Sequence, residues 1–193
     1  MPAVTNISAS SDSYINGLLG PYKWATNSLS FSFPSSGSFY GGSEYSADDE
    51  HLGGFAPLNA TQQAAVREAL AMYAAGAGLS FTEIGETASQ HGDLRFAMSN
   101  APSTAWAYYP NLAPAGGDFW CNRSDYNSPV MGSYAFTTFV HELGHALGLK
   151  HPAGGHRNAG RRDSMEYTVM SYHSYVGSPL TGYTNETWGF ASR

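Results

Sequence analysis

The sequence predicts one α/β domain in which a β-sheet is layered against helices. Three observations carry this prediction: short segments with strand periodicity or strand-like aromatic content, a capped amphipathic helix, and a second helix rich in histidine. Along the chain they follow the order strand, helix, strands and helix. With 193 residues and 42% hydrophobic content, the chain suits one domain with a genuine core, and a second full domain is not expected.

The first strand and the first helix are predicted from local patterns. "SLSFSF", residues 28–33, alternates apolar and polar residues as a strand does. A helix is predicted to begin at Asn59, which forms a capping-box pattern with Gln62, and to stop at Gly76 to Gly78. Its apolar positions have helical spacing: Val66, Ala69, Leu70 and Tyr73. Further strands are predicted in "LSFTEI", "GDLRFAMS", "AWAYYP" and "GDFWC".

The second helix, about residues 133–148, carries the candidate chemistry in "HELGHALGLKHP", residues 141–152. Because a helix advances about 100° per residue, His141 and His145 lie on one face and can share a metal ion. Glu142 lies on the same half of the helix and is a candidate base. Gly148 can take a left-handed conformation that ends the helix, so that His151 approaches as a third ligand.

The opposite half of this helix is a continuous apolar stripe that is predicted to face the core: Phe136, Phe139, Val140, Leu143 and Leu147. Structural zinc is usually closed by four protein ligands, often including cysteine, and Cys121 is the only thiol in the chain. The three histidines and Glu142 therefore favour a catalytic metal. Cys121 itself is expected to pack as a small apolar residue.

Composition and charge exclude several classes of function. A net charge of -6 with only 9 Lys and Arg residues lacks the basic surface that nucleic acid or an anionic membrane requires, which points to a protein or peptide partner. No apolar run reaches the roughly 18 residues of a membrane span, and the first 20 residues lack the pattern of an N-terminal secretory signal.

The pattern H-E-x-x-H-x-x-G-x-x-H resembles the metzincin signature, whose second element is a methionine turn further along the chain. "EYTVMSYHSY", residues 166–175, supplies Met170 for that turn and Tyr172 two residues later. "HELGHALGLKHP", "AWAYYP", "GGDFWCN" and "NGLLGPYKW" all resemble segments of serralysin catalytic domains. The resemblance implies a metzincin-type fold: a twisted, mostly parallel sheet with an antiparallel edge strand, packed against an active-site helix and a second helix.

The resemblance also implies the roles of the site residues. One catalytic Zn²⁺ is expected on His141, His145 and His151, with Glu142 as the general base of peptide hydrolysis. Tyr172 is expected to be an additional, weaker zinc ligand that swings away to hydrogen-bond the tetrahedral intermediate. Met170 is expected to form an apolar floor that does not coordinate the metal.

Peptide substrates are expected to bind at an edge strand. An exposed sheet edge can add an extended peptide as an extra strand, and "AWAYYP", residues 105–110, resembles the serralysin edge strand. Ala105 and Ala107 are predicted to pair through their main chains. The rings of Trp106, Tyr108 and Tyr109 are candidates for lining subsites, although strand alternation prevents all three from facing the cleft.

The expected domain organisation is a mobile N-terminal arm or propeptide remnant in residues 1–20, followed by a catalytic domain in residues 21–193 that is truncated at its C-terminal end. Serralysins normally continue into glycine-rich repeats that bind Ca²⁺, and no such repeat occurs in this sequence. Calcium is therefore expected mainly in the absent repeats. A separate C-terminal segment and a protein inhibitor are further potential partners.

The motif and the resemblance together favour a zinc endopeptidase. The resemblance further implies that it is secreted, because serralysins are exported from Gram-negative bacteria through a C-terminal signal. The alternatives are a zinc-organised peptide-binding module or inactive fragment without catalysis, and a zinc hydrolase that acts on a non-peptide amide. Two groups of residues are expected to stay outside the site. The acidic run Asp48, Asp49 and Glu50 is expected to be a solvated loop, and the remaining histidines are expected to be exposed or hydrogen-bonded: His51, His91, His156 and His173.

Overall fold

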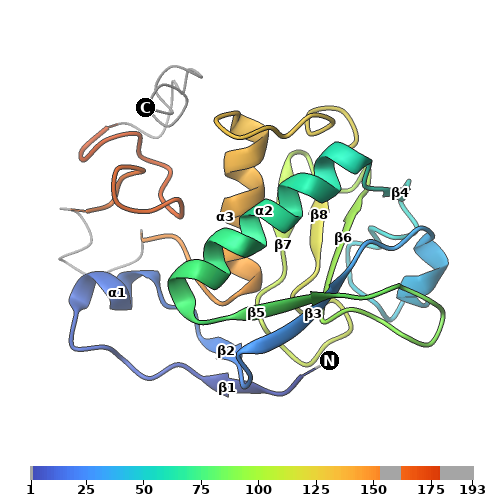
Figure 1. Cartoon of the computed structure of the whole chain (residues 1–193), viewed down its shortest axis with the longest axis horizontal. Coiled ribbons are helices and arrows are strands. Elements are labelled where there is room, and N and C mark those ends of the chain that lie inside the picture. The colour runs from blue at the N-terminus through green and yellow to red at the C-terminus, as the bar shows by residue number, and fades with distance from the viewer. Residues whose placement is uncertain (1, 153–161, 179–193) are drawn as a thin grey trace.

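The structure is a computed structural model that describes residues 2–152 and 162–178 (Figure 1). Its helices are α1 (Ser13–Leu18), α2 (Ala60–Ala77) and α3 (Tyr134–Ala146), with one 3₁₀ turn at Gly37–Tyr40. Its strands are β1 (Val4–Asn6), β2 (Tyr22–Trp24), β3 (Ser28–Ser32), β4 (Ala56–Pro57), β5 (Ser80–Glu83), β6 (Leu94–Met98), β7 (Ala105–Ala107) and β8 (Phe119–Cys121). All predicted strands and both predicted helices are present within a few residues of their expected bounds.

The main sheet has the strand order β5-β3-β6-β8-β7, with β4 paired to β6 outside that order. β5, β3, β6 and β8 run parallel, whereas β7 pairs antiparallel with β8 at the edge. Figure 1 shows α2 and α3 beside this sheet, where they contact each other. The predicted fold, a mostly parallel sheet with an antiparallel edge strand and two packed helices, is confirmed.

The ends of α2 follow the signals in its sequence. Asn59 accepts a hydrogen bond from the Gln62 main chain at 2.9 Å, and the Gln62 side chain accepts one from the Asn59 main chain at 2.7 Å. This reciprocal capping box satisfies two main-chain donors that a helix start leaves unpaired. The helix ends at Gly78, whose φ of 62° is left-handed, so the predicted stop is confirmed.

Two apolar clusters cover the two faces of the sheet, as a parallel sheet requires. The larger lies between the sheet and the helices α2 and α3, and it includes Phe96, Phe119 and Cys121. The intervening residues Ala97 and Trp120 point to the other face, into an aromatic cluster. That cluster consists of Tyr40, Tyr45, Ala97, Ala115 and Trp120, with Phe55, Trp106 and Tyr108 packed against it. Cys121 is fully buried, as expected.

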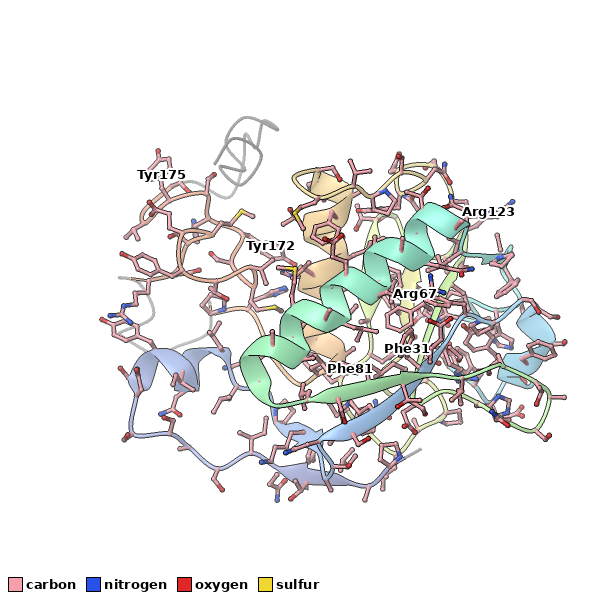
Figure 2. The ribbon with its side chains drawn as sticks, viewed as in Figure 1. Phe31, Arg67, Phe81, Arg123, Tyr172 and Tyr175 are labelled. Carbon is pink, nitrogen blue, oxygen red and sulfur yellow. The ribbon has the colours of Figure 1, made fainter. Side chains whose placement is uncertain are left out.

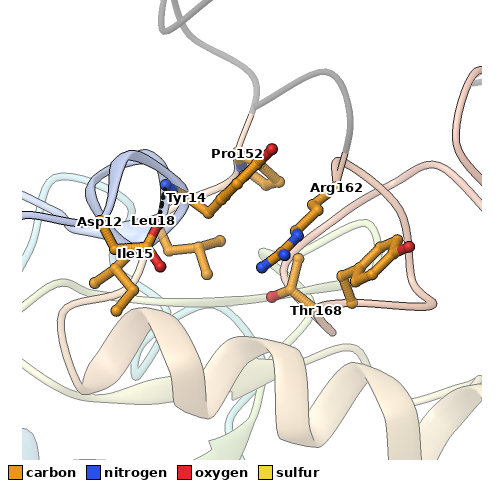
Figure 3. A pocket seen from close by; sticks show the side chains of 8 residues that line it. Asp12, Tyr14, Ile15, Leu18, Pro152, Arg162 and Thr168 are labelled. Carbon is orange, nitrogen blue, oxygen red and sulfur yellow. Dashed lines mark hydrogen bonds between the residues drawn. The ribbon is translucent and has the colours of Figure 1, made fainter. Parts of the chain in front are cut away.

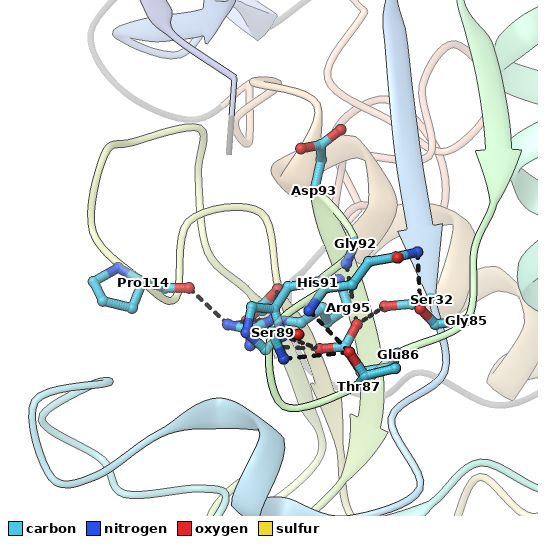
Figure 4. Close-up of polar contacts among 12 residues, drawn as sticks. Ser32, Gly85, Glu86, Thr87, Ser89, His91, Gly92, Asp93, Arg95 and Pro114 are labelled. Carbon is cyan, nitrogen blue, oxygen red and sulfur yellow. Dashed lines mark hydrogen bonds and ion pairs between the residues drawn. The ribbon is translucent and has the colours of Figure 1, made fainter.

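Buried charges beside the aromatic cluster are paired with each other, and Figure 4 shows Arg95 and Glu86 of this network. The Arg95 guanidinium lies 2.7 Å from the Asp118 carboxylate and stacks over the Tyr40 ring at 4.3 Å. Glu86 accepts hydrogen bonds from Ser32 and from the main chain of Gly92. Because a charge is costly to bury without such partners, the network fixes the loops at this end of the sheet.

In the loop between β3 and α2, Asp48 is exposed as expected, but the expectations for Glu50 and His51 are wrong. Glu50 is fully buried, because the Trp106 indole, the Tyr108 hydroxyl and the Ser46 hydroxyl all donate to its carboxylate in place of water. His51 is also buried, packs against the Tyr45 ring at 4.9 Å, and has no hydrogen bond at either ring nitrogen among the described residues. The aromatic cluster therefore draws both side chains inward.

The other histidines outside the site behave as expected where the structure describes them. His91 bonds to Glu86 at 2.7 Å, and His173 bonds to the main-chain carbonyl of Ser178. His156 lies outside the described residues. No helix within residues 2–152 and 162–178 combines the length and apolar character that crossing a membrane demands.

The N-terminal residues form regular structure against the rest of the chain. β1 pairs antiparallel with β2, and Asp12 caps the start of α1 by accepting a hydrogen bond from the Tyr14 main chain at 2.8 Å. An isolated bridge joins Leu19 to Leu149, just before the third predicted metal ligand. The assignment of residues 1–20 as a mobile arm or propeptide remnant stays a prediction.

Candidate active site

Helix α3 positions the first three site residues. Ser133 caps it by accepting a hydrogen bond from the Phe136 main chain at 3.1 Å, and its apolar stripe is buried in the core beneath the sheet. His141 and His145 therefore occupy the opposite face with their ring centroids 4.9 Å apart. The helix ends at Ala146, and Gly148 has a φ of 103°, which confirms the predicted glycine stop.

The turn at Gly148 brings His151 back to the helix. Its Nε2 atom lies 3.0 Å from Nε2 of His141 and 3.0 Å from Nε2 of His145. A continuing helix would have carried His151 away along the axis, so the change of direction at Gly148 assembles the cluster. The three predicted ligands are thus brought together.

Main-chain carbonyls fix which nitrogen of each helix histidine faces the centre. Nδ1 of His141 lies 2.7 Å from the Val169 carbonyl, and Nδ1 of His145 lies 2.8 Å from the Leu149 carbonyl. A carbonyl can only accept, so Nδ1 carries the hydrogen and each Nε2 presents its lone pair to the cluster. Burial lowers the pKa of both rings to about 4, and the pKa of His151 is lowered as well.

The cluster fits a zinc ion. Zn–N bonds of about 2.0–2.1 Å in a tetrahedral site place two ligand nitrogens roughly 3.3 Å apart, close to the spacing here. The rings are neutral near pH 7, which ligation requires. Among the described residues, the group that could hold a metal consists of His141, His145 and His151, so a position remains for water or substrate.

Glu142 is buried beside this cluster, and burial raises its pKa to about 8. A hydrogen bond from the Ala107 main chain opposes the rise. The carboxyl is therefore largely protonated near neutral pH in the metal-free protein, and a neighbouring divalent cation would favour its ionised form. A cavity of about 100 Å³ adjoins it, with His141, Glu142, Ala105 and Tyr172 among the lining residues.

Residues 162–178 resume the described chain and contribute Met170 and Tyr172 to the surroundings of the site. Met170 is fully buried and faces Gly144 of α3, where an added Cβ would collide with its sulfur. Tyr172 is 47% exposed, and its ring centroid lies 4.3 Å from that of His151. Figure 2 shows Tyr172 beside α3, whereas Tyr175 lies further from that helix. The absence of metal coordination by Met170 and the ligand role of Tyr172 stay predictions.

The edge strand β7 presents alternate main-chain groups to the site. Tyr108 donates to the Asp118 carbonyl at 3.0 Å and Thr104 accepts from Asn122 at 2.7 Å, so even-numbered positions pair with β8. The intervening residues, Ala105 and Ala107, turn their main-chain groups away from β8. The Ala107 main-chain N–H donates to the Glu142 carboxyl, so the Ala107 carbonyl and the main-chain groups of Ala105 are the ones directed to the open side. This is the geometry that pairing with an extended peptide requires.

The aromatic residues of this stretch divide between the two faces of the sheet. The side chains of Trp106 and Tyr108 lie in the aromatic cluster and bond to Glu50, away from the histidines. Tyr109 is the ring that reaches the site, with its centroid 5.3 Å from that of His145. Strand alternation could not place Tyr109, because β7 ends at Ala107.

A second cavity of about 190 Å³ borders the residue after His151 (Figure 3). It is lined by Asp12, Tyr14, Ile15, Leu18, Pro152, Arg162, Tyr167 and Thr168. Arg162 lies over the Tyr14 ring at 4.3 Å, so α1 faces the segment that leads to Met170. No local pattern predicts this contact, because its two sides are far apart in the chain.

The site combines a three-histidine centre on a glycine-terminated helix with a carboxyl on that helix and a buried methionine on the following loop. This combination characterises the class of zinc proteases known as metzincins. Comparison with known proteins narrows the class. Serralysin A of Dickeya chrysanthemi is 36% identical over 63% of this chain and 28% of its own length. Serralysin of Photorhabdus luminescens is 32% identical over 64% of this chain and 29% of its own length.

The chain is therefore similar to serralysins over a little less than two thirds of its length, and its mixed α/β fold is consistent with a metzincin-like domain. It spans less than a third of the length of the serralysins it matches. No family model matches the chain. The homology supports a zinc metalloprotease, and the histidine cluster could hold the metal that this class uses.

Proposed function

We propose that this chain is the catalytic domain of a secreted zinc endopeptidase. The observation that carries the proposal is the convergence of three histidine Nε2 atoms next to a buried glutamate and an open sheet edge. A bound metal would activate water, and Glu142 can move the proton of that water. The edge of β7 can hold an extended peptide.

His141, His145 and His151 would hold a zinc ion through their Nε2 atoms, and the carbonyls of Val169 and Leu149 orient the rings of His141 and His145. Bound zinc supplies a Lewis acid that polarises the scissile carbonyl and makes a coordinated water more acidic. Glu142 accepts a proton from the attacking water and delivers it to the leaving amine.

Four further residues assist around this centre. Tyr172, a weaker ligand in the resting state, hydrogen-bonds the oxyanion that develops in the transition state. Ala105 and Ala107 align the substrate through their main-chain groups, which suits broad sequence tolerance. Met170 provides the apolar floor beneath the site and does not bind the metal.

The wider setting of the domain is also a proposal, because the chain spans only part of its relatives. Residues 21–193 form the catalytic domain, export places it outside a Gram-negative cell, and calcium binds mainly in a C-terminal part that lies beyond this sequence. That part and a protein inhibitor are candidate partners beside the peptide substrate. Because the chain has only part of the length of its relatives, one alternative function is a zinc-organised peptide-binding module that does not hydrolyse its peptide.

Chelator-sensitive cleavage of an unfolded protein tests the proposal. Casein should be degraded by the 193-residue chain, the activity should be lost after dialysis against a chelator, and added zinc should restore it, because removing the metal removes the group that activates water. The measurement is the rate of release of acid-soluble peptide. Stoichiometric zinc without any cleavage of casein would favour the peptide-binding module instead.

Proton release during zinc binding tests the environment of Glu142. With a pKa of about 8, its carboxyl is about nine-tenths protonated at pH 7 in the metal-free chain, and bound zinc drives that proton off. Calorimetric titration with zinc in two buffers of different ionisation enthalpy should therefore show nearly one more proton released by the wild type than by Glu142→Gln. The difference should fall to about half a proton near pH 8 and decline further as the pH rises above the pKa of the carboxyl. Equal release at pH 7 would contradict the assigned environment.

A further inference from the structure

The turn that carries the third histidine is held by the N-terminal part of the chain. We call residues 146–150 the histidine turn and residues 18–24 the N-terminal clamp. Gly20 donates from its main chain to the Gly148 carbonyl at 2.8 Å, and Lys150 donates to the Leu18 carbonyl at 2.7 Å. These two bonds flank the antiparallel bridge between Leu19 and Leu149. The clamp therefore pairs with the chain up to the residue before His151.

A third contact ties the clamp to the end of the metal helix. The buried Trp24 indole donates to the Ala146 carbonyl at 2.9 Å. Ala146 is the last residue of α3, and carbonyls at a helix end lack partners within the helix. Trp24 thus caps α3 at the point where the chain leaves it for His151.

The clamp also acts on a histidine that it does not contact. Leu149, which the bridge holds, supplies the carbonyl that orients Nδ1 of His145 at 2.8 Å. Movement of the histidine turn would therefore change both the ring orientation of His145 and the approach of His151. Mutation of a group that hydrogen-bonds to a metal ligand typically lowers metal affinity by about 10- to 100-fold.

We propose that the N-terminal clamp, acting through Gly20 and Trp24, is a positioning element of the zinc site. The inference rests on the proposed function, because it concerns the ligands of the same metal. It also revises the expected domain boundary: a cut after residue 20 would remove Leu18 and Gly20 from the histidine turn. Any N-terminal processing that leaves an intact metal site must therefore occur before Leu18.

Substitution of Gly20 tests the contact between the clamp and the histidine turn. An added Cβ there would lie 2.6 Å from the Gly148 carbonyl oxygen, although Gly20 has no left-handed φ that would strain an alanine. Gly20→Ala should therefore push the two segments apart at their bridge. Gly76→Ala is the matched control, because a Cβ at Gly76 meets no atom within 4 Å.

The experiment measures zinc affinity by competition with a chelating dye, together with the visible spectrum after Co²⁺ substitution. Gly20→Ala should bind zinc about 10- to 100-fold more weakly and show an altered Co²⁺ spectrum, whereas Gly76→Ala should match the wild type. Trp24→Phe, which removes the indole donor and keeps an aromatic ring, should shift both readouts in the same direction. If the clamp were merely structural, the two clamp variants would have a lower thermal stability, and the Co²⁺ spectrum of the folded protein would not change.

Wild-type zinc affinity and a wild-type Co²⁺ spectrum in Gly20→Ala would overturn the proposal. If circular dichroism shows that Gly20→Ala is unfolded without metal, Trp24→Phe decides by the same two readouts. Neither readout depends on peptide cleavage. A wild-type chain that binds zinc but leaves casein intact would therefore defeat the proposed function while leaving the positioning role of the clamp open to the same comparison of variants.

Discussion

Glu142→Gln is expected to lower casein hydrolysis by about 10²- to 10⁴-fold while zinc remains bound at one ion per chain. Glutamine keeps the size of the side chain and can still accept the hydrogen bond from the Ala107 main chain, but it cannot take a proton from water. The three histidine ligands are untouched, so the metal should stay. Initial rates and zinc content, measured on the same preparation, separate loss of the base from loss of the metal.

Glu68→Gln is a matched control, because it makes the same change at an exposed position of α2. Its rate should equal that of the wild type. Glu142→Ala should lose activity as Glu142→Gln does. Substantial hydrolysis by both Glu142 variants would mean that the proton is handled by another group, and the general-base assignment would be wrong.

Local patterns in the sequence were sufficient for most of the fold. The capping box between Asn59 and Gln62 needs only residues three positions apart, and the stop at Gly78 depends on one residue. The i, i+4 pair His141 and His145 is likewise a property of one helix. Even the arrival of His151 could be predicted, because Gly148 ends that helix within the same short segment.

Contacts between distant segments could not be predicted in the same way. The carbonyl of Val169 reaches His141 across 28 positions, and Trp24 reaches Ala146 across 122. Main-chain carbonyls leave no signature in a sequence, so the groups that orient the ligands were missed. The residues between β3 and α2 show no periodicity, which explains why the aromatic cluster around Tyr45 and the burial of Glu50 were also missed.

His145→Ala is expected to weaken zinc binding by more than about 100-fold, the upper range for loss of a group that only orients a ligand, because it removes one of the three histidine ligands. The fold should persist in the metal-free state, since His145 lies on the site face of α3 and the buried stripe on the other face is unchanged. Zinc content after dialysis against a weak chelator is the direct measurement, with circular dichroism as the test of folding.

His91→Ala is the control for this substitution, because His91 bonds to Glu86 in a loop of the main sheet and takes no part in the cluster. It should retain one zinc per chain and the wild-type rate on casein. Stoichiometric zinc in His145→Ala would show that the metal is held by other groups, and the ligand assignment would fall with it. Loss of zinc together with loss of cleavage, in a chain that remains folded, would instead tie the activity to the histidine cluster that α3 and the glycine turn assemble.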